Sequence, residues 1–339
     1  MHDTTMTDLP TTATSDDDTR AAARLAWARE ASRGPVEALH RASADAGFRS
    51  YWRGAPDGIV MDSPPALEDV RPWLAMHAVL ESGGVRVPRI LARDVAAGFL
   101  LLEDLGPSTC LQVADDGNVD ALVDAALAQL LRLQAIDCPP GLPAYDRALL
   151  ARELGLFREW FLQRHLGVVL DAGEDAALSG IESLLVDAAL AQPQVLVHRD
   201  FMLRNLMPVA DGPAVLDFQD AVRGPIAYDM LSLCRDAFAS WPEERVARWR
   251  DDYRARAEAA GLPVPDAARF ERDFDLVGVQ RHLKVLGIFA RLHHRDGKPR
   301  YLADAPRFLG YLDTVLPRYP GLAPLAAILE RHVRPVLAG

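Results

Sequence analysis

Lysine is almost absent from this chain. Among 339 residues the 37 Lys and Arg include only two lysines, Lys284 and Lys298, so positive charge elsewhere must come from arginine. Cysteine is also sparse. Cys110, Cys138 and Cys234 are scattered without the close spacing of a cysteine metal site, which excludes that class of protein. A small, odd set of this kind predicts reduced thiols in a cytoplasmic protein.

Long apolar runs and excess positive charge are missing as well. No apolar run approaches the length needed to span a bilayer. Residues 1–19 are rich in Thr and Asp and contain neither a basic nor an apolar region, so we expect a disordered tail and no secretory signal peptide. The formal net charge of −11 argues against a protein that coats nucleic acid or anionic membrane. We therefore expect a cytoplasmic monomer without nucleic-acid or membrane partners.

The most informative segment contains two apolar runs, each followed by polar residues. The first run, 195–197, is followed by Asp200 and, five residues later, by Asn205. The second run, 214–216, is followed directly by Asp217. A turn signal lies between the runs, so we expect a strand hairpin that brings two carboxylates and an amide together.

This combination is what metal-assisted phosphoryl transfer requires. One carboxylate takes the proton of an acceptor hydroxyl, and an Asn and an Asp hold magnesium on nucleotide phosphates. His198-Arg199-Asp200 alone is a common tripeptide, but the apolar strands around H-x-D-x4-N and the Asp-Phe that follows make the pattern more specific. We predict a kinase-type catalytic site that uses ATP and Mg²⁺.

The chain divides into a strand-rich first part and a helical second part. The break between them is Glu103–Pro107, which we expect to be a hinge. We predict an α+β, bilobal protein with a tail at 1–19, a small β-rich N-lobe at 20–104 and a larger, mostly helical C-lobe at 105–339. The pattern predicts strands at 48–52, 58–61, 85–91 and 98–102, and helices at 20–32, 67–80, 149–162, 178–191, 228–239, 245–260, 270–292 and 322–336, with another from Asp120.

The chain resembles the aminoglycoside-phosphotransferase-type kinases, which have the protein-kinase-like fold. This broad resemblance rests on the His198-Arg199-Asp200 tripeptide with Asn205, and on Asp217. The chain is still more similar to the bacterial kinases that phosphorylate N-acetylmuramate and N-acetylglucosamine at C1 during cell-wall (peptidoglycan) recycling. Four longer segments carry that narrower resemblance: Val60–Pro65, Leu100–Gly106, Asp217–Leu233 and Gln280–Gly287.

The resemblance implies an ATP-dependent kinase with an amino sugar as substrate. It implies that Asp200 is the base, that Asn205 and Asp217 bind magnesium, and that Glu103 and Leu105 bring backbone groups to the adenine. His198 and Asp229 are expected to brace the catalytic loop. The candidates to hold the sugar, because hydroxyl-rich ligands are bound by charged hydrogen-bonding groups, are Asp220, Arg223, Arg204 and Arg281.

The N-lobe departs from the family pattern. Kinases of this fold carry a strand lysine that grips the nucleotide phosphates and pairs with a helix glutamate. No lysine precedes Lys284, and a glycine-rich loop is missing too. Arg49 and Arg53, near the first strand turn, are the candidates to bind the phosphates instead, because arginine is a bidentate phosphate ligand.

Two other functions remain open on the sequence. One is a kinase of the same fold that acts on an aminoglycoside, choline or another alcohol, and the acidic net charge is compatible with a polycationic antibiotic. The other is a nucleotide-binding pseudokinase that acts as a regulator, which the missing lysine motivates. The intact Asp200, Asn205 and Asp217 argue against this second alternative.

Overall fold

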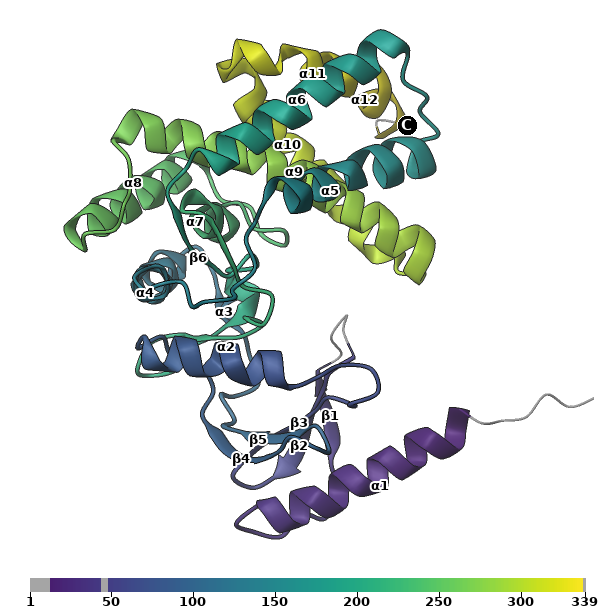
Figure 1. Cartoon of the computed structure of the whole chain (residues 1–339), viewed down its shortest axis with the longest axis vertical. Helices are drawn as coiled ribbons and strands as arrows, with labels where there is room; N and C mark the ends of the chain where they lie inside the picture. Colours follow the sequence, from purple (N-terminus) through teal and green to yellow (C-terminus); the bar gives the residue numbers. More distant parts are fainter. Residues whose placement is uncertain (1–12, 44–47, 338–339) are drawn as a thin grey trace, which may run out of the picture. The chain divides into compact units, whose positions relative to one another are not determined.

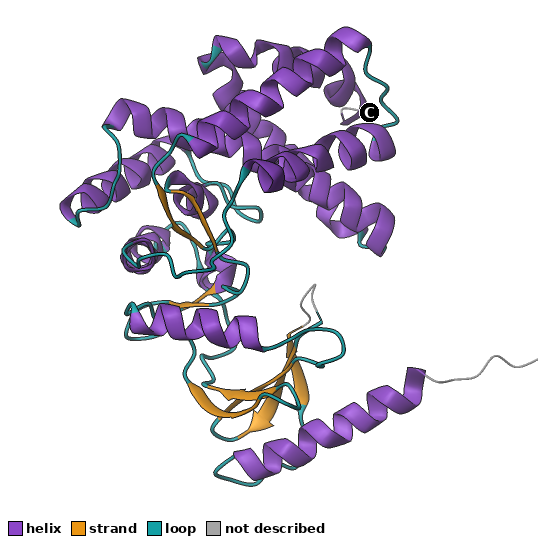
Figure 2. Cartoon of the chain, in the orientation of Figure 1, coloured by secondary structure: helices purple, strands orange, loops and turns teal. Residues whose placement is uncertain are grey.

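Two compact units make up the structure. The computed structural model describes residues 13–43 and 48–337. The first unit comprises residues 1–75 and 87–107, and the second comprises the rest of the chain. The first unit contains a five-stranded sheet, whereas the second is mostly helical, as the colouring of Figure 2 makes clear. The prediction of an α+β chain with a strand-rich first part is confirmed.

The sheet of the first unit is antiparallel, with strand order β1-β2-β3-β5-β4. All residues of β5 are buried, as its unbroken apolar run predicts. The strand expected at 85–91 is wrong for its first half, because Pro88 has no N–H to donate to a ladder and pairing begins at Ile90. We did not predict β1, a short, polar edge strand. The strands are β1 His40–Ser43, β2 Ser50–Ala55, β3 Gly58–Asp62, β4 Ile90–Asp94 and β5 Phe99–Leu102.

Helix α1, Ala13–Ala31, packs against this sheet (Figure 1). Its Ala28 is buried in a cluster with Val60 and Leu101 of the sheet. The helix includes residues 13–19, where we expected a disordered tail, and residues 1–12 of that tail lie outside the described residues. The helix that we predicted at 20–32 thus begins at Ala13 in the structure.

A buried carboxylate anchors α1 to the end of β3. Asp62 is 1% exposed and accepts hydrogen bonds from Arg20, at 2.6 and 3.0 Å, and from Arg24, at 2.7 Å. The two guanidinium groups also lie over the rings of Phe99 and Trp52. Asp62 accepts hydrogen bonds from two arginines of α1, so the helix compensates its negative charge. The two arginines therefore have a structural role.

The second unit is built around α9, Ala267–Asp296, which contacts α5, α6, α7 and α10 (Figure 1). The helix predicted at 228–239 ends at Cys234, and we did not predict α10. The other helices are α2 Arg71–Ser82, which begins in the first unit, α3 Cys110–Val113, α4 Val119–Gln134, α5 Arg147–Leu156, α6 Ala172–Leu190, α7 Ala227–Cys234, α8 Glu243–Ala259, α10 Ala305–Val315, α11 Ala323–Ile328 and α12 Arg334–Leu337. The strands are β6 Gln194–Val197, β7 Leu206–Met207, β8 Ala214–Val215 and β9 Val222–Pro225, and the π- and 3₁₀-turns are η1 Phe157–His165, η2 Leu203–Asn205, η3 Pro299–Asp304, η4 Leu316–Arg318, η5 Pro320–Leu322 and η6 Leu329–Val333.

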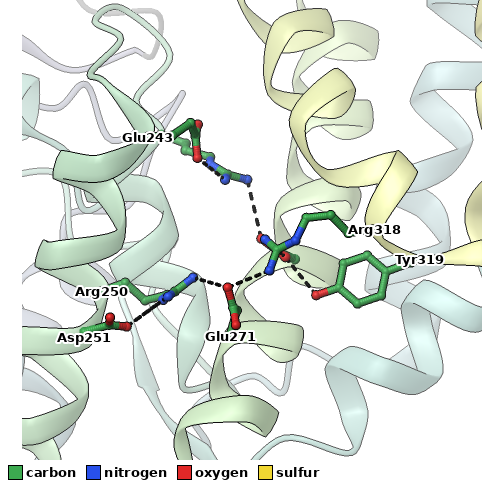
Figure 3. Close-up of polar contacts among 8 residues, drawn as sticks. Glu243, Arg250, Asp251, Glu271, Arg318 and Tyr319 are labelled. Atoms are coloured by element: carbon green, nitrogen blue, oxygen red, sulfur yellow. Dashed lines mark hydrogen bonds and ion pairs between the residues drawn. The ribbon is translucent and has the colours of Figure 1, made fainter.

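Close helix contact and ion pairs both fix α9. At Gly287 a Cβ atom would overlap the backbone of Leu156, so only glycine allows α9 to approach the end of α5 this closely. Figure 3 shows Glu271 of α9 between two arginines, with Arg250 of α8 at 2.9 Å and Arg318 at 2.6 Å. Arg318 also reaches the buried Asp275 at 2.6 Å. None of the helices in the described part is long and apolar enough to cross a membrane.

Candidate functional site

The two apolar runs of the catalytic segment form strands in two different ladders. The first run lies in β6, which pairs with β9, whereas the second lies in β8, which pairs with β7. The prediction that the two runs form a hairpin with each other is therefore wrong, and the hairpin that ends at the Asp211-Gly212 turn is β7–β8. The backbone N–H of Leu216 donates to the carbonyl of Asn205 at 2.9 Å and extends this pairing toward Asp217. The residue after the first run, His198, contacts the carbonyl of Leu216 at the end of the second run, so the ends of the two runs lie close together.

A buried carboxylate on α7 holds the loop that follows β6. Asp229 accepts hydrogen bonds from the backbone N–H groups of His198, at 2.7 Å, and Arg199, at 2.9 Å. The Asp229 side chain is fully buried, and this burial raises its pKa to about 6 although both bonds favour the ionised form. The prediction that Asp229 holds the catalytic loop by hydrogen bonds is confirmed.

His198 connects the two halves of the segment. Its Nδ1 accepts a hydrogen bond from the backbone N–H of Asp200 at 3.3 Å, and its Nε2 lies 2.8 Å from the carbonyl oxygen of Leu216. Because Nδ1 is an acceptor here, the proton lies on Nε2 and donates to Leu216. The ring is 1% exposed and lies edge-on to Phe201. The prediction that His198 braces the loop is confirmed.

Asn205 joins the segments that carry the two aspartates. Its Nδ2 donates to the backbone carbonyl of Asp200 at 2.9 Å, while its own carbonyl accepts from Leu216, next to Asp217. With Nδ2 fixed in this way, Oδ1 accepts no hydrogen bond from any described residue. The Asp217 side chain is exposed, and its Oδ1 accepts from Gln219 at 2.8 Å.

The donor atoms of this group fit a nucleotide-bound magnesium ion. Magnesium prefers oxygen ligands and is commonly bound by one or two protein carboxylates together with substrate phosphates. Asn205 offers an amide oxygen and Asp217 a carboxylate. Within residues 13–43 and 48–337 no group of three or more His, Cys, Asp or Glu is arranged to hold a metal ion.

Cationic side chains surround Asp200. Nη2 of Arg281, on α9, lies 3.9 Å from Oδ1 of Asp200, whose side chain is half exposed. Partial burial acts to raise the pKa of Asp200, but the charges of Lys284 and Arg281, together with those of the loop, outweigh it and lower the pKa below its usual value. Asp200 is therefore ionised at neutral pH and able to accept a proton.

A buried ion cluster lies under the loop, and no pattern in the sequence indicated it. Glu153 of α5 pairs with Arg199 at 2.5 Å and with Lys284 of α9 at 3.1 Å. Its other oxygen accepts from the hydroxyl of Tyr145, and Lys284 also donates to the hydroxyl of Tyr228 at 3.2 Å. Burial acts to raise the pKa of Glu153, but the two cations outweigh it and lower that pKa. A single glutamate in an amphipathic helix has no distinguishing pattern, so only the structure reveals this role.

The predicted nucleotide-site residues all belong to the first unit. Arg49, just before β2, is 8% exposed, and its Nε lies 3.2 Å from Oε1 of Glu68. Arg53 of β2 donates to both oxygens of Asp104 at 2.8 Å and to the carbonyl of Gly106 at 2.6 Å. Arg53 thus holds the segment after β5 in place.

The two remaining nucleotide candidates lie in that segment. Glu103 pairs with Arg89 at 3.2 Å, and its backbone N–H donates to the carbonyl of the same residue. The backbone N–H of Leu105 has no hydrogen bond to any described residue. A backbone donor on the strand-to-helix connection is therefore available to a ligand.

The structure brings some of the predicted sugar-binding residues to Asp200 but not others. Arg281 is beside it, and Arg204 of η2 lies over the ring of Phe238, 4.6 Å from its centroid. Asp220 is exposed, and its carbonyl accepts from Arg199 at 3.4 Å. Arg223 is exposed on β9, and in the described part of the chain no contact joins its side chain to the loop.

We did not single out Asp236 from the sequence, and it lies near Arg281 and Arg204. Asp236 lies just after α7, which ends earlier than predicted. Its Oδ1 accepts a hydrogen bond from the backbone N–H of Phe238 at 2.7 Å. Burial raises its pKa to about 6 against the opposing charges of Arg281, Arg307 and Arg204. The sequence predicted helix through this position, which hid its placement.

Relatives with curated names match nearly the whole chain. The protein is 52% identical over 299 residues to an N-acetylmuramate/N-acetylglucosamine kinase of Pseudomonas aeruginosa, and 50% identical over 299 residues to one of Pseudomonas putida. In both cases the match covers 87% of this chain and 88% of the relative. The similarity therefore includes both units.

Solved structures show the same fold at low sequence identity. A choline/ethanolamine kinase family protein from Mesorhizobium loti matches with a TM-score of 0.59 and 17% identity, covering 91% of this chain and 98% of that one. The ADP-bound aminoglycoside phosphotransferase APH(2'')-Ib matches with a TM-score of 0.57 and 14% identity, covering 81% and 93%. The model of the phosphotransferase enzyme family matches residues 38–270. Because this family model matches most of the chain, and because named relatives are about half identical to the chain, the protein belongs to the phosphotransferase enzyme family.

Proposed function

We propose that the protein is an ATP-dependent kinase that phosphorylates the anomeric C1 hydroxyl of N-acetylmuramate, N-acetylglucosamine or both in peptidoglycan recycling. The relatives from both Pseudomonas species support the choice of acceptor, since they are named as kinases of these two sugars. The observation that carries the proposal is the arrangement of the catalytic segment, in which Asn205 is hydrogen-bonded to Asp200 and to the residue before Asp217.

Asp200 is the proposed base. It accepts the proton of the C1 hydroxyl while the sugar oxygen bonds to the γ-phosphorus of ATP and ADP leaves. The lowered pKa supports this role, because the carboxylate is ionised before the reaction. Most of the rate is expected to come from alignment and from charge stabilisation, as in other phosphoryl transfers.

Magnesium is the proposed metal, with Asn205 and Asp217 as its protein ligands. When bound, the ion neutralises charge on the transferring phosphates. The free Oδ1 of Asn205 supports this assignment, because its Nδ2 is already committed to Asp200. His198 and Asp229 keep these ligands in place, because Asp229 accepts a hydrogen bond from the loop backbone and His198 contacts the residue before Asp217.

Residues 20–104 are the proposed nucleotide-binding N-lobe. Arg49 replaces the missing lysine, and its ion pair with Glu68 supports this, because a partner carboxylate would orient the guanidinium toward phosphate. Arg53 contributes by fixing the segment that contains Glu103 and Leu105, which would meet the adenine through backbone groups.

Residues 105–339 are the proposed catalytic and sugar-binding C-lobe. Arg281 is the best supported of the four candidates for the sugar, because it lies 3.9 Å from the proposed base. Arg204 is next, and Asp220 and Arg223 are proposed at the exposed edge of the site. Cations next to the base argue against a polycationic aminoglycoside as acceptor, since like charges repel at short range.

One assay separates the proposed function from its alternatives. The protein is incubated with Mg-ATP and N-acetylmuramate, N-acetylglucosamine, kanamycin or choline, and ADP release and sugar 1-phosphate are measured. We expect turnover with at least one of the two amino sugars. Turnover with kanamycin or choline alone would favour the small-molecule alternative, and ATP binding without turnover of any acceptor would favour a pseudokinase.

A further inference from the structure

Arg199 reaches from the proposed catalytic loop to a buried glutamate. Nη2 of Arg199 lies 2.5 Å from Oε1 of Glu153, which is 5% exposed on α5. Nη1 of the same guanidinium donates to the backbone carbonyl of Asp220 at 3.4 Å, three residues after Asp217. The fork of one arginine thus joins the loop of the proposed base, helix α5 and the segment that follows a proposed metal ligand.

The ion pair restrains the backbone that leads to the proposed base. Arg199 has a φ of 76°, a left-handed conformation that is strained for a residue other than glycine. Its N–H donates to Asp229 at 2.9 Å, and its side chain is held by Glu153. Because Cα is tetrahedral, restraining its amide nitrogen and its side chain also restrains the direction of its third bond, which leads to Asp200.

Charge balance in the core does not by itself require Arg199. Oε1 of Glu153 also lies 3.1 Å from Nζ of Lys284 on α9, and Oε2 accepts from the hydroxyl of Tyr145. Lys284 is 8% exposed, and its Nζ donates to the hydroxyl of Tyr228 at 3.2 Å. One buried carboxylate thus faces two cations, and the lysine alone would compensate its charge. The second pair, with the loop, is therefore available for a role other than burying Glu153.

We propose that Glu153 is a positioning residue for phosphoryl transfer, which acts through Arg199 to hold the loop of Asp200 and the segment after Asp217 at a fixed spacing. This inference rests on the proposed function and adds a residue to the same site. Among the described residues, Glu153 makes no hydrogen bond or ion pair with a proposed ligand of the nucleotide, the metal or the sugar. Its effect on the rate is through alignment, and a displacement of about 1 Å can cost about 100-fold.

Arg199→Met tests the link without unbalancing the core. Lys284 stays opposite Glu153, so the variant leaves no buried charge without a partner and should fold. Turnover is measured with Mg-ATP and N-acetylmuramate or N-acetylglucosamine, whichever the wild-type protein phosphorylates faster. We expect kcat to fall about 10- to 100-fold, because the loop and the segment after Asp217 are no longer joined. The KM values for ATP and the sugar should stay near those of wild type, since no proposed ligand of either substrate changes.

A double-mutant cycle tests whether Glu153 acts through Arg199. Glu153→Gln keeps the size of the side chain but removes its charge, and it should lower kcat by a factor similar to that of Arg199→Met. The double variant should be no slower than the slower single variant, because the same interaction is already lost. Losses that multiply in the double variant, or a kcat of Arg199→Met near that of wild type, would overturn the proposal.

Glu271 of α9 is the matched control, since it also lies between two cations. Its partners are Arg250 at 2.9 Å and Arg318 at 2.6 Å, and neither belongs to the proposed catalytic loop (Figure 3). Glu271→Gln should lower the melting temperature and leave kcat near that of wild type. A comparable loss of kcat in this control would assign the effects to general destabilisation and overturn the positioning role while leaving the kinase function standing. Failure of the wild-type protein to phosphorylate either amino sugar would overturn the proposed function, and the positioning role with it.

Discussion

At the scale of single residues, unfavourable backbone geometry is confined to the proposed catalytic loop. Among the described residues other than glycine, only Arg199 and Asp217 have a positive φ, at 76° and 63°. Such conformations cost about 1–3 kcal/mol each and persist where surrounding bonds enforce them. Here Asp229 holds the backbone N–H of Arg199, and Leu216, just before Asp217, is bonded through its N–H and its carbonyl. The two positive-φ residues thus lie next to the proposed base, Asp200, and at a proposed metal ligand, Asp217.

The proposed base can be tested by an isosteric change. Asp200→Asn should lower kcat by at least about 100-fold, the low end of what general base catalysis contributes, because an amide cannot take the hydroxyl proton. ATP binding should persist, since none of the proposed nucleotide ligands changes. Turnover by ADP release and ATP affinity by calorimetry measure the two effects. A near-normal rate would mean that another group is the base.

The proposed substitute for the missing lysine gives a second test. Arg49→Ala should raise the KM for ATP, and Glu68→Gln should raise it less, because the neutral partner orients Arg49 weakly. The control is Asp69→Asn, which changes the neighbouring residue but breaks only an exposed pair with Arg71. That control should leave the KM unchanged. An unchanged KM for Arg49→Ala would remove this residue from the nucleotide site.

Asp236 should reduce stability in a pH-dependent way. Its folded-state pKa of about 6 is above the usual value of 3.8, so folding favours the protonated form, and the stability present below about pH 4 is lost as the pH rises through 6. Asp236→Asn removes that loss and should stabilise the protein by about 1–3 kcal/mol at pH 7.5. The difference should shrink at pH 4.5. Urea unfolding at both pH values measures it, and destabilisation at pH 7.5 would contradict this account.

At the scale of elements, the contact between α9 and the end of α5 depends on one glycine. Gly287→Ala would force a Cβ into the backbone of Leu156 and should destabilise the protein by about 1–3 kcal/mol. Gly180 in α6 is the matched control, because nothing lies within 4 Å of the position of its Cβ. Gly180→Ala should stabilise by about 0.5–1 kcal/mol through helix propensity. Thermal denaturation distinguishes the two, and equal effects would refute the close contact.

The helix boundaries show where a local sequence pattern no longer predicts the structure. The apolar periodicity predicted α8 and α9 well, because a long helix repeats its pattern over many turns. It failed at the end of α7, where the pattern continues past Cys234 but the chain leaves the helix at Arg235, which is 2% exposed and pairs with Glu243. Arg235 thus pairs with the first residue of α8, and Asp236 lies after the end of α7.

At the scale of the whole molecule, arginine replaces lysine in nearly every ionic role. Arg20 and Arg24 anchor α1, Arg53 fixes the segment after β5, and Arg250 and Arg318 connect helices in the second unit. The planar guanidinium suits these sites because it can bond two acceptors at once. Among the described ion pairs, Lys284 provides a lysine instead, buried under the proposed catalytic loop against Glu153.

The sequence by itself determined the strand-rich and helical parts and the departure at the missing lysine, and it is the source of the chemistry proposed for the catalytic segment. These follow from patterns local to the chain: apolar runs, turn residues and the spacing of Asp200, Asn205 and Asp217. Only the tertiary structure decided which distant groups meet them. Glu153 and Arg281 reach the loop from separate helices, α5 and α9, and long-range contacts between single charged residues leave no periodic trace in a sequence.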